Sequence, residues 1–510
     1  MRHKTGSLLF VMLFAVAFPA SAELKISENE DFTFGVIPYL RMDSITLTNT
    51  VDLDTRKRDD LTTYIGMDYS LGFDLKYKDT GPELFLKLER TGPYDYDVPL
   101  FIDNTLMTFT GKIRPYHGSD LLPKVKELWL DLPIYGDTVR VMGGLYVYSV
   151  GHGISLGGEY ENYGVTLSME GEGFEWRFYY CWPDVANKNI MGPQIKQEKE
   201  QGINYERSKA YFFATDMTLS TERDITKWTV QPYLGALFDK TDEKRIDYFL
   251  TPTRQELLGT CGVSVDFIIE RLALSFETAR NFGRAERYDS DSQDVEHMGY
   301  FFYADASYTF DKLSPHSRFI FASGNKLTPE MIENGDTSFE SSKNNAFSVY
   351  SPLNVGLADS LYSPIETVPI LAMGNGYGLN YGVPRPSTFL DPRTIENLIT
   401  IDVGFDYSFT DKVSFTFDWW YLRSVERGVG MYNFVAERIS PDLGNEFDLS
   451  LICAFNDNLT LEVYGAIFLP GRAYKKVRDD TGGSLFTPFV RGDGKADPAY
   501  QLEACLALTF

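Results

Sequence analysis

Acidic side chains stand at alternate positions along short stretches of this sequence, where they could select ions. Asp402 and Asp406 alternate with large apolar residues over 401–409, and Asp418 alternates in the same way with aromatic residues. In an extended strand every second side chain lies on one face, so this spacing puts the acids on one face and the apolar groups on the other. A wall that carries rows of carboxylates favours cations over anions.

Little in the sequence supports covalent chemistry. It has no H-E-x-x-H zinc motif and no glycine-rich phosphate loop, and His152, between two glycines, has no recognisable catalytic partner. The four cysteines, Cys181, Cys261, Cys453 and Cys505, lack the spacing of zinc or haem motifs. We therefore predict no enzyme activity, no catalytic residue, no cofactor and no metal site.

The overall charge excludes one class of partner. The chain carries 72 acidic and 48 basic side chains, for a formal net charge of −24. Nucleic-acid binding depends on cations that replace counterions along the phosphates, so we expect no nucleic-acid partner.

The elements that must hold these residues are strands. Period-2 alternation recurs along the whole chain, whereas sustained 3.6-residue periodicity is nearly absent. Eight short links and nine long links join the predicted strands in near-strict alternation. The strands are predicted near 31–47, 61–77, 82–91, 123–132, 137–149, 163–169, 173–182, 207–220, 225–239, 256–269, 271–282, 297–310, 315–324, 397–409, 412–424, 445–455, 458–469 and 499–510.

An even number of strands, with tight turns at one end and long loops at the other, is typical of a transmembrane barrel. We therefore predict an all-β fold, an antiparallel transmembrane β-barrel of about 18 strands in the bacterial outer membrane, with short periplasmic turns and long extracellular loops. After residue 22 there is no run of about 20 apolar residues, so only a closed barrel could span the membrane.

Residues 1–22 predict a cleaved signal peptide. Arg2 and Lys4 precede an apolar stretch over 8–18, and Ala20-Ser21-Ala22 forms a small-residue cleavage site. The apolar stretch is too short to cross a bilayer. We expect export, with 23–510 forming the mature barrel.

The end of the chain supports this prediction. Over 499–510 apolar and polar residues alternate up to the terminal Phe510. A final amphipathic strand that ends in an aromatic residue resembles the signal recognised by the bacterial barrel-assembly machinery. We expect that machinery as a partner through Phe510, together with outer-membrane lipid and lipopolysaccharide around the barrel.

Several patches of the sequence resemble the alginate-export family of outer-membrane barrels. They are the stretch 126–144 followed by Gly151-His152-Gly153, the stretch 161–165, and Phe321-Ala322-Ser323-Gly324-Asn325 before Ala346-Phe347. The resemblance implies an eighteen-stranded barrel that exports an acidic polysaccharide. One departure counts against that substrate: where the family has Gly-Arg-Gln, this chain has Gly143-Gly144-Leu145, so an arginine that would face the pore is missing.

If the apolar residues face lipid, the alternate residues line the lumen. Acids predominate among these residues, which predicts a channel that tolerates cations or neutral solutes. A charge such as Glu175 could instead pair with its same-face neighbour Arg177 and brace the wall. The predicted pore-lining residues are Asp68, Asp74, Glu89, Glu127, Arg140, Glu175, Arg177, Asp216, Asp266, Asp305, Asp402, Asp406, Asp418, Asp448 and Glu462.

These observations lead to a main functional hypothesis and two alternatives. The main hypothesis is a porin-like channel for passive passage or export of hydrophilic solutes, including polysaccharide, with the long loop 325–396 folded partly into the pore. The first alternative is a barrel that serves as a scaffold or sheath for a periplasmic or secreted partner protein. The second, a barrel enzyme, is disfavoured for want of a catalytic set. The sequence indicates neither the solute nor the oligomeric state.

Overall fold

The computed structural model describes residues 24–48, 61–90, 124–182, 210–240, 253–287, 294–328, 397–474 and 497–509, with short gaps inside these ranges, and the short segments 102–107 and 343–347. The predicted signal peptide, 1–22, lies outside the described residues, as do Phe510 and most of 325–396. No helix among the described residues is long and apolar enough to cross a membrane.

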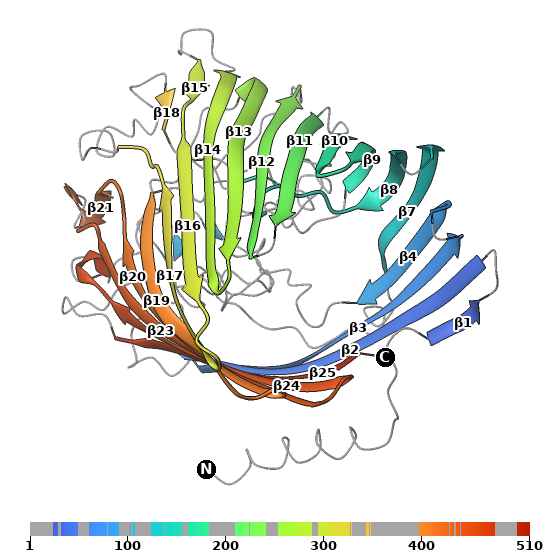
Figure 1. The fold of residues 1–510 in the computed structure, drawn as a ribbon. Helices are drawn as coiled ribbons and strands as arrows, with labels where there is room; N and C mark the ends of the chain where they lie inside the picture. The colour runs from blue at the N-terminus through green and yellow to red at the C-terminus, as the bar shows by residue number, and fades with distance from the viewer. Residues whose placement is uncertain are drawn as a thin grey trace.

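One closed antiparallel sheet dominates the structure (Figure 1). Three of its 21 strands are short and lie outside the ring, which leaves eighteen strands in the barrel. In chain order these are β2 (Phe32–Thr48), β3 (Leu61–Tyr77), β4 (Glu83–Arg90), β7 (Lys124–Tyr135), β8 (Val139–Tyr146), β9 (Asn162–Gly171), β10 (Phe174–Cys181), β11 (Ala210–Arg223), β12 (Thr226–Asp239), β13 (Thr253–Ile269), β14 (Leu272–Arg287), β16 (Tyr300–Tyr308), β17 (Leu313–Ala322), β19 (Leu398–Thr410), β20 (Val413–Arg423), β23 (Asp442–Asn456), β24 (Leu459–Pro470) and β25 (Ala499–Thr509).

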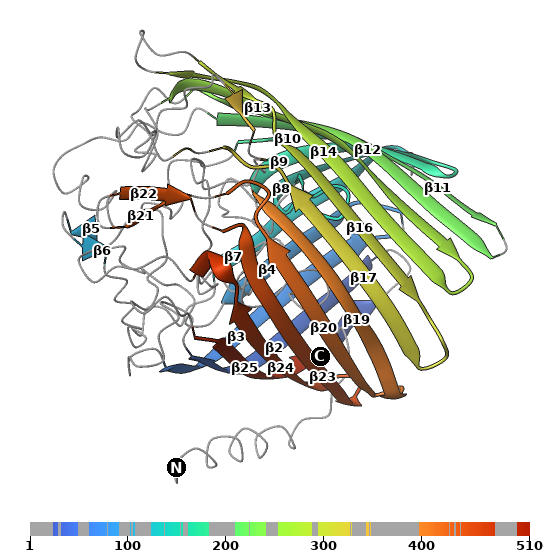
Figure 2. The same cartoon turned by 90° about the vertical axis from the view of Figure 1, so that its left-hand side faces the viewer.

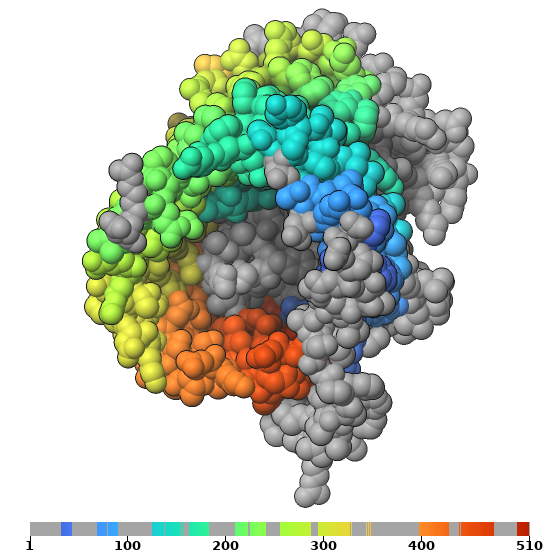
Figure 3. Space-filling model, turned by 45° about the vertical axis from the view of Figure 1, so that its right-hand side comes forward, coloured from blue at the N-terminus to red at the C-terminus, as the bar shows by residue number. Residues whose placement is uncertain are grey.

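The first and last strands of the ring close the barrel. β25 pairs with β2 from Thr509 opposite Tyr39 to Tyr500 opposite Thr48. Figure 1 shows these blue and red strands side by side, and Figure 3 shows the wall as a ring seen from one end. The eighteen-strand count and the antiparallel closure predicted from the sequence are therefore confirmed.

The remaining short elements lie outside the ring. β1 (Leu24–Glu28) pairs with β2, and β15 (Val295–His297) pairs with β14 and, in parallel, with β18 (Lys343–Asn344). Two small hairpins, β5 (Ile102–Asp103) with β6 (Leu106–Met107) and β21 (Val429–Tyr432) with β22 (Val435–Arg438), lie at the end of the barrel opposite the tight turns (Figure 2). A 3-10 turn, η3 (Arg472–Tyr474), follows β24.

Eight tight connections, each predicted from the sequence, join strands at one end of the barrel, which we call the turn end. Three of these turns contain a non-glycine residue in the left-handed region: Lys78, Glu270 and Asp311, with φ of 56°, 51° and 51°. Such residues are uncommon and usually occur in turns, where a short connection requires this conformation. The opposite end of the barrel is called the loop end.

The two faces of the wall differ in chemistry. On β19, Ile401 and Val403 are 41% and 48% exposed, whereas Asp402 between them is fully buried. The outward side chains are thus apolar, and in a closed barrel such a surface contacts lipid. Other exposed apolar residues on the barrel strands are Phe213, Leu234, Phe276, Phe302, Trp419, Leu449, Ile467 and Leu502.

The inner face changes along the barrel axis. Near the loop end it carries large buried apolar side chains, among them Phe212, Leu237, Phe301, Trp420 and Phe468. From the middle of the strands towards the turn end, charged and polar residues take their place. The inner wall therefore has a charged layer towards the turn end and a mainly apolar layer at the loop end, in which Glu256, His297 and Glu446 are also buried.

Candidate functional site

The charged layer forms the candidate site. It runs along the inner face from β10 to β20, and we call it the charged belt. Because each strand pairs in register with the next, alternate residues of neighbouring strands lie side by side and their charges meet across strand boundaries. The belt consists of Arg177, Asp216, Asp266, Glu277, Asp305, His316, Arg318, Asp402, Asp406 and Asp418.

The residues predicted to line a pore fall on the inner face as far as they are described. Asp216, Asp402, Asp418 and Asp448 are buried there. Asp68 lies on β3, but its side chain is outside the described residues. The others are partly exposed: Asp74, Glu89, Glu127, Arg140, Glu175, Arg177, Asp266, Asp305, Asp406 and Glu462. That these residues contact a passing solute stays a prediction.

Outside the charged belt, inner-face charges form separate pairs. Arg140 lies 2.9 Å from Asp131, and Arg41 lies 3.2 Å from Glu503 across the β2–β25 seam. The belt itself holds the denser networks, and these fall into two parts.

In the first part, the described residues of 147–156 (147–153, Ser155 and Leu156), which follow β8, lie against the inner face of β10 to β14; we call them the docked segment. The ring of Tyr148 stacks on Tyr179 of β10, with centroids 4.1 Å apart and planes 3° from parallel. The Tyr148 hydroxyl donates a hydrogen bond of 2.8 Å to Asp216 of β11. Asp216 also accepts hydrogen bonds from Arg177 and Gln231. The carboxylate is therefore fully supplied with donors although it is buried.

The tip of the docked segment contacts the turn-end half of the wall. The backbone amide of Gly151 donates to Gln231, and that of His152 donates to Glu277. The His152 ring lies 3.0 Å from Glu277 and 3.1 Å from Asp266 through its two nitrogens. Glu277, 1% exposed, also accepts hydrogen bonds from the hydroxyls of Ser155 and Tyr233.

The loop expected to narrow the pore was 325–396, and only its first part is described. There Ser323 donates a hydrogen bond to the carbonyl of Asn345, and Asn325 accepts one from the Asn345 amide. Phe347 is buried with its ring 5.3 Å from that of Phe301. This part is fastened to the wall at the loop end; the rest of the prediction concerns residues outside the described ones. The segment that does lie along the inner wall, 147–156, was not predicted to do so.

The sequence Gly153-Ile154-Ser155-Leu156-Gly157, which begins in the docked segment and ends one residue beyond it, matches the Gly-x-Ser-x-Gly pattern of serine hydrolases. In those enzymes the serine is exposed on a turn between a strand and a helix and contacts a histidine base. Here Ser155 is buried and hydrogen-bonded to Glu277 and Tyr233, while both His152 nitrogens face carboxylates. The geometry therefore gives Ser155 a structural role.

The second part of the belt lies on β17, β19 and β20. His316 lies 2.6 Å from Asp418, 3.2 Å from Asp406 and 3.7 Å from Asp402. Arg318 donates to Asp305 at 2.9 Å and lies 3.5 Å from Asp402. Sequence reasoning placed these acids on one face but did not single out His316, which shares the inner face of β17 with Arg318.

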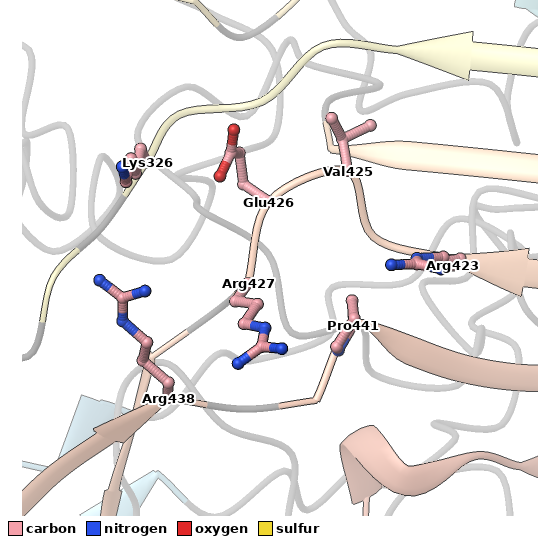
Figure 4. A pocket seen from close by; sticks show the side chains of 7 residues that line it. All are labelled: Lys326, Arg423, Val425, Glu426, Arg427, Arg438 and Pro441. Carbon is pink, nitrogen blue, oxygen red and sulfur yellow. The ribbon is translucent and has the colours of Figure 1, made fainter.

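At the loop end, a pocket of about 280 Å³ opens beside the ends of β17, β20 and β22 (Figure 4). Four cations and one acid, Glu426, line it, and Figure 4 shows the cationic side chains around one space: Lys326, Arg423, Arg427 and Arg438. None of the four lies within 4.0 Å of a carboxylate of a described residue. In a chain of net charge −24 this is an unusual concentration of positive charge, and we call it the basic pocket.

A closed antiparallel barrel with a lipid-facing apolar exterior, a charged interior, tight turns at one end and long loops at the other defines a bacterial outer-membrane β-barrel protein.

No protein-family model and no curated protein sequence matches the chain. Among solved structures it is similar to OccK9 (OpdG) of Pseudomonas aeruginosa (10% identity, 94% of this chain and 98% of that chain covered, TM-score 0.49). It is also similar to the Pseudomonas aeruginosa outer membrane protein opdK (9%, 93% and 98%, 0.45) and to Acinetobacter baumannii OccAB4 (11%, 95% and 99%, 0.47). The function of this chain is therefore inferred from its own barrel.

Proposed function

We propose that the protein is a passive outer-membrane channel for small hydrophilic solutes. The observation that carries this proposal is the charged belt on the inner face of a closed eighteen-strand barrel. Charges on the inner face do not contact lipid and do not help the barrel to pack in the membrane. A polar inner wall does let hydrated solutes pass down their gradient. The mechanism is diffusion, with no bond made or broken.

Acidic residues in the charged belt support a preference for cations. The belt contains seven carboxylates against Arg177, Arg318 and His316, with Asp448 and Glu462 adding further acid on the next strands. A negative potential along the path raises the local concentration of cations and lowers that of anions.

The test is a planar-bilayer recording on the mature protein, with a salt gradient across the bilayer. We expect discrete conductance steps and a reversal potential that favours cations. A reversal potential that favours anions would contradict the role of the acidic belt. A folded barrel without conductance would contradict the open channel and support the scaffold alternative.

A second candidate function, export of an acidic polysaccharide, is favoured by the basic pocket and by the sequence resemblance. Four cations, which outnumber Glu426 in the lining, could hold a polyanion at the loop end. Against it, Gly144 cannot be replaced by the family's arginine in this chain. Its φ is 145°, and a Cβ there would lie 2.1 Å from the Leu128 carbonyl oxygen.

The basic pocket has its own test. Replacing Arg423 and Arg438 together by Gln should weaken binding of an oligouronate, measured by calorimetry, and leave the conductance to potassium chloride unchanged. Wild-type protein that binds no oligouronate would remove this second candidate and leave the channel proposal intact.

The scaffold alternative needs a lumen wide enough for a protein. The docked segment takes up space along the inner face of β10 to β14, which favours small solutes. The barrel-assembly machinery and lipopolysaccharide remain proposed partners. Phe510 lies outside the described residues, and β25, the strand before it, closes the barrel.

A further inference from the structure

Three residues of the charged belt meet at one point of the inner wall. His316 on β17, Asp402 on β19 and Asp418 on β20 come from adjacent strands, and all three are buried. One nitrogen of the histidine and one oxygen of each aspartate lie within 4.8 Å of one another. Three donor atoms at this separation can share one ion.

A glycine makes this convergence geometrically feasible. Gly404 on β19 lies opposite His316 on one side and Asp418 on the other. A Cβ at Gly404 would lie 2.3 Å from an Asp418 oxygen and 2.5 Å from the His316 Nε2. Because Gly404 has no side chain, His316 and Asp418 can contact each other across the strand between them.

The His316 ring is held in one orientation. Its Nδ1 lies 3.2 Å from Asp406, and Asp406 accepts a hydrogen bond of 2.7 Å from the Thr416 hydroxyl. Its Nε2 therefore points at Asp418 and Asp402. A histidine whose Nδ1–H is bonded to a carboxylate while Nε2 faces other acidic groups has the arrangement of a metal ligand with an outer partner.

The protein supplies too few donors for the acids at this point. Neither oxygen of Asp402 and only one oxygen of Asp418 has a hydrogen-bond partner among the described residues, although both side chains are fully buried. Arg318 approaches no closer than 3.5 Å to Asp402 and 3.9 Å to Asp418, because its Nε is bonded to Asp305. A buried carboxylate without donors is costly, so another positive group is called for.

A proton on His316 does not meet this need. Doubly protonated, the ring would donate to Asp406 and Asp418 and still leave Asp402 without a donor. Four carboxylates, Asp305, Asp402, Asp406 and Asp418, would then face the two cations Arg318 and His316. With all four carboxylates ionised, two negative charges would remain uncompensated inside the wall.

We propose that His316, Asp402 and Asp418 bind one divalent transition-metal ion, with Zn²⁺ as the reference ligand. One imidazole nitrogen with two carboxylate oxygens suits Zn²⁺ and its first-row neighbours, whereas Ca²⁺ and Mg²⁺ select oxygen ligands alone. The burial of all three ligands indicates a structural site that braces β17, β19 and β20. The site was not predicted from the sequence because its members are separated by 86 and 16 positions.

The experiment uses the full barrel purified in detergent, stripped with chelator and dialysed. Zn²⁺ is titrated by calorimetry, bound metal is counted by elemental analysis, and the folded state is checked by heat-modifiable migration on gels. We expect one Zn²⁺ per barrel. Asp402→Asn should lose binding, and Asp406→Asn, which alters only the outer partner, should weaken it about 10- to 100-fold.

Two controls separate this site from its surroundings. Asp305→Asn removes a charge from the same cluster without removing a ligand and should keep the stoichiometry. His152→Gln removes the histidine of the docked segment, which contacts the belt at Glu277 and Asp266, and should also keep the stoichiometry. Folded wild-type protein that binds no Zn²⁺ would overturn the proposal, and so would binding that survives Asp402→Asn but is lost with His152→Gln. The wild-type result decides the matter even where a variant fails to fold.

Discussion

Glu277 and Asp402 both lie buried on the inner wall, one in each part of the charged belt, but they differ in the hydrogen-bond donors that surround them. Both carboxylates are buried, at 1% and 0% exposure. Glu277 accepts hydrogen bonds from the hydroxyls of Ser155 and Tyr233 and from the backbone of His152. Asp402 accepts none from the described residues.

The difference lies in what covers each acid. The docked segment brings donors to the wall between β10 and β14, so that the chain itself neutralises Glu277 and Asp216. No described segment brings a comparable set of donors to the Asp402 carboxylate. A buried acid is tolerated when the fold supplies donors, and where the fold does not, a bound cation is one way to stabilise its charge.

The largest effect is expected where the donors are most numerous. Glu277→Gln removes the charge that holds His152, Ser155 and Tyr233, and should lower the free energy of unfolding by about 3–5 kcal/mol. Urea titration in micelles, followed by tryptophan fluorescence, measures it. Because the docked segment would lose its main anchor, single-channel conductance should rise. A variant as stable as the wild type would show that Glu277 is not the anchor.

On the other side of the comparison, Gly404→Ala should disturb the β17–β20 cluster. The added methyl group would overlap Asp418 and His316, at an expected cost of about 1–3 kcal/mol, and Zn²⁺ binding should be lost. Gly465→Ala is the matched control, because a Cβ there meets nothing closer than 3.9 Å. The control should stay within about 0.5 kcal/mol of the wild type. Equal behaviour of the two variants would contradict the role of Gly404.

A smaller effect is expected when one donor among several is removed. Tyr148→Phe keeps the ring stacked on Tyr179 and removes only the hydrogen bond to Asp216. Asp216 retains Arg177 and Gln231, so the cost should be about 1 kcal/mol. The same urea titration applies. A loss as large as that of Glu277→Gln would mean that the acid depends on this single hydroxyl.

The smallest effect is expected at the edge of the belt. Glu175 lies 3.8 Å from Arg177 and is 36% exposed at its side chain, so water screens the pair. Glu175→Gln should change stability by no more than about 1 kcal/mol. It should still make the reversal potential slightly less cation-selective. A loss of stability well above about 1 kcal/mol would contradict the view that water screens this ion pair.

Most of the fold could be predicted because alternation and turn length are local signals. The stretch predicted near 61–77 is β3, and each of the eight tight turns was found. β13 and β14 extend beyond their predicted ends, to Thr253 and Arg287. There the strands lack the regular apolar residues that a lipid-facing stretch requires, so periodicity did not reveal them.

The site was harder to predict because its contacts are long-range. Parity put Asp216, Asp402 and Asp418 on the inner face, but it could not show that His152 meets Glu277, 125 positions away. A loop has no periodicity that would indicate which wall it contacts.

The seam of the barrel has a consequence for its biogenesis. One edge of β2 pairs with β25 over 39–48 and with β1 over 33–36. Arg41 and Glu503, which meet across this seam, are 462 positions apart. Most of that edge can therefore pair only after the last strand of the chain has been made. Until then β1 can cover only its turn-end part. An unpaired strand edge can pair with other chains. The nascent barrel is therefore prone to aggregation until β25 has paired with β2.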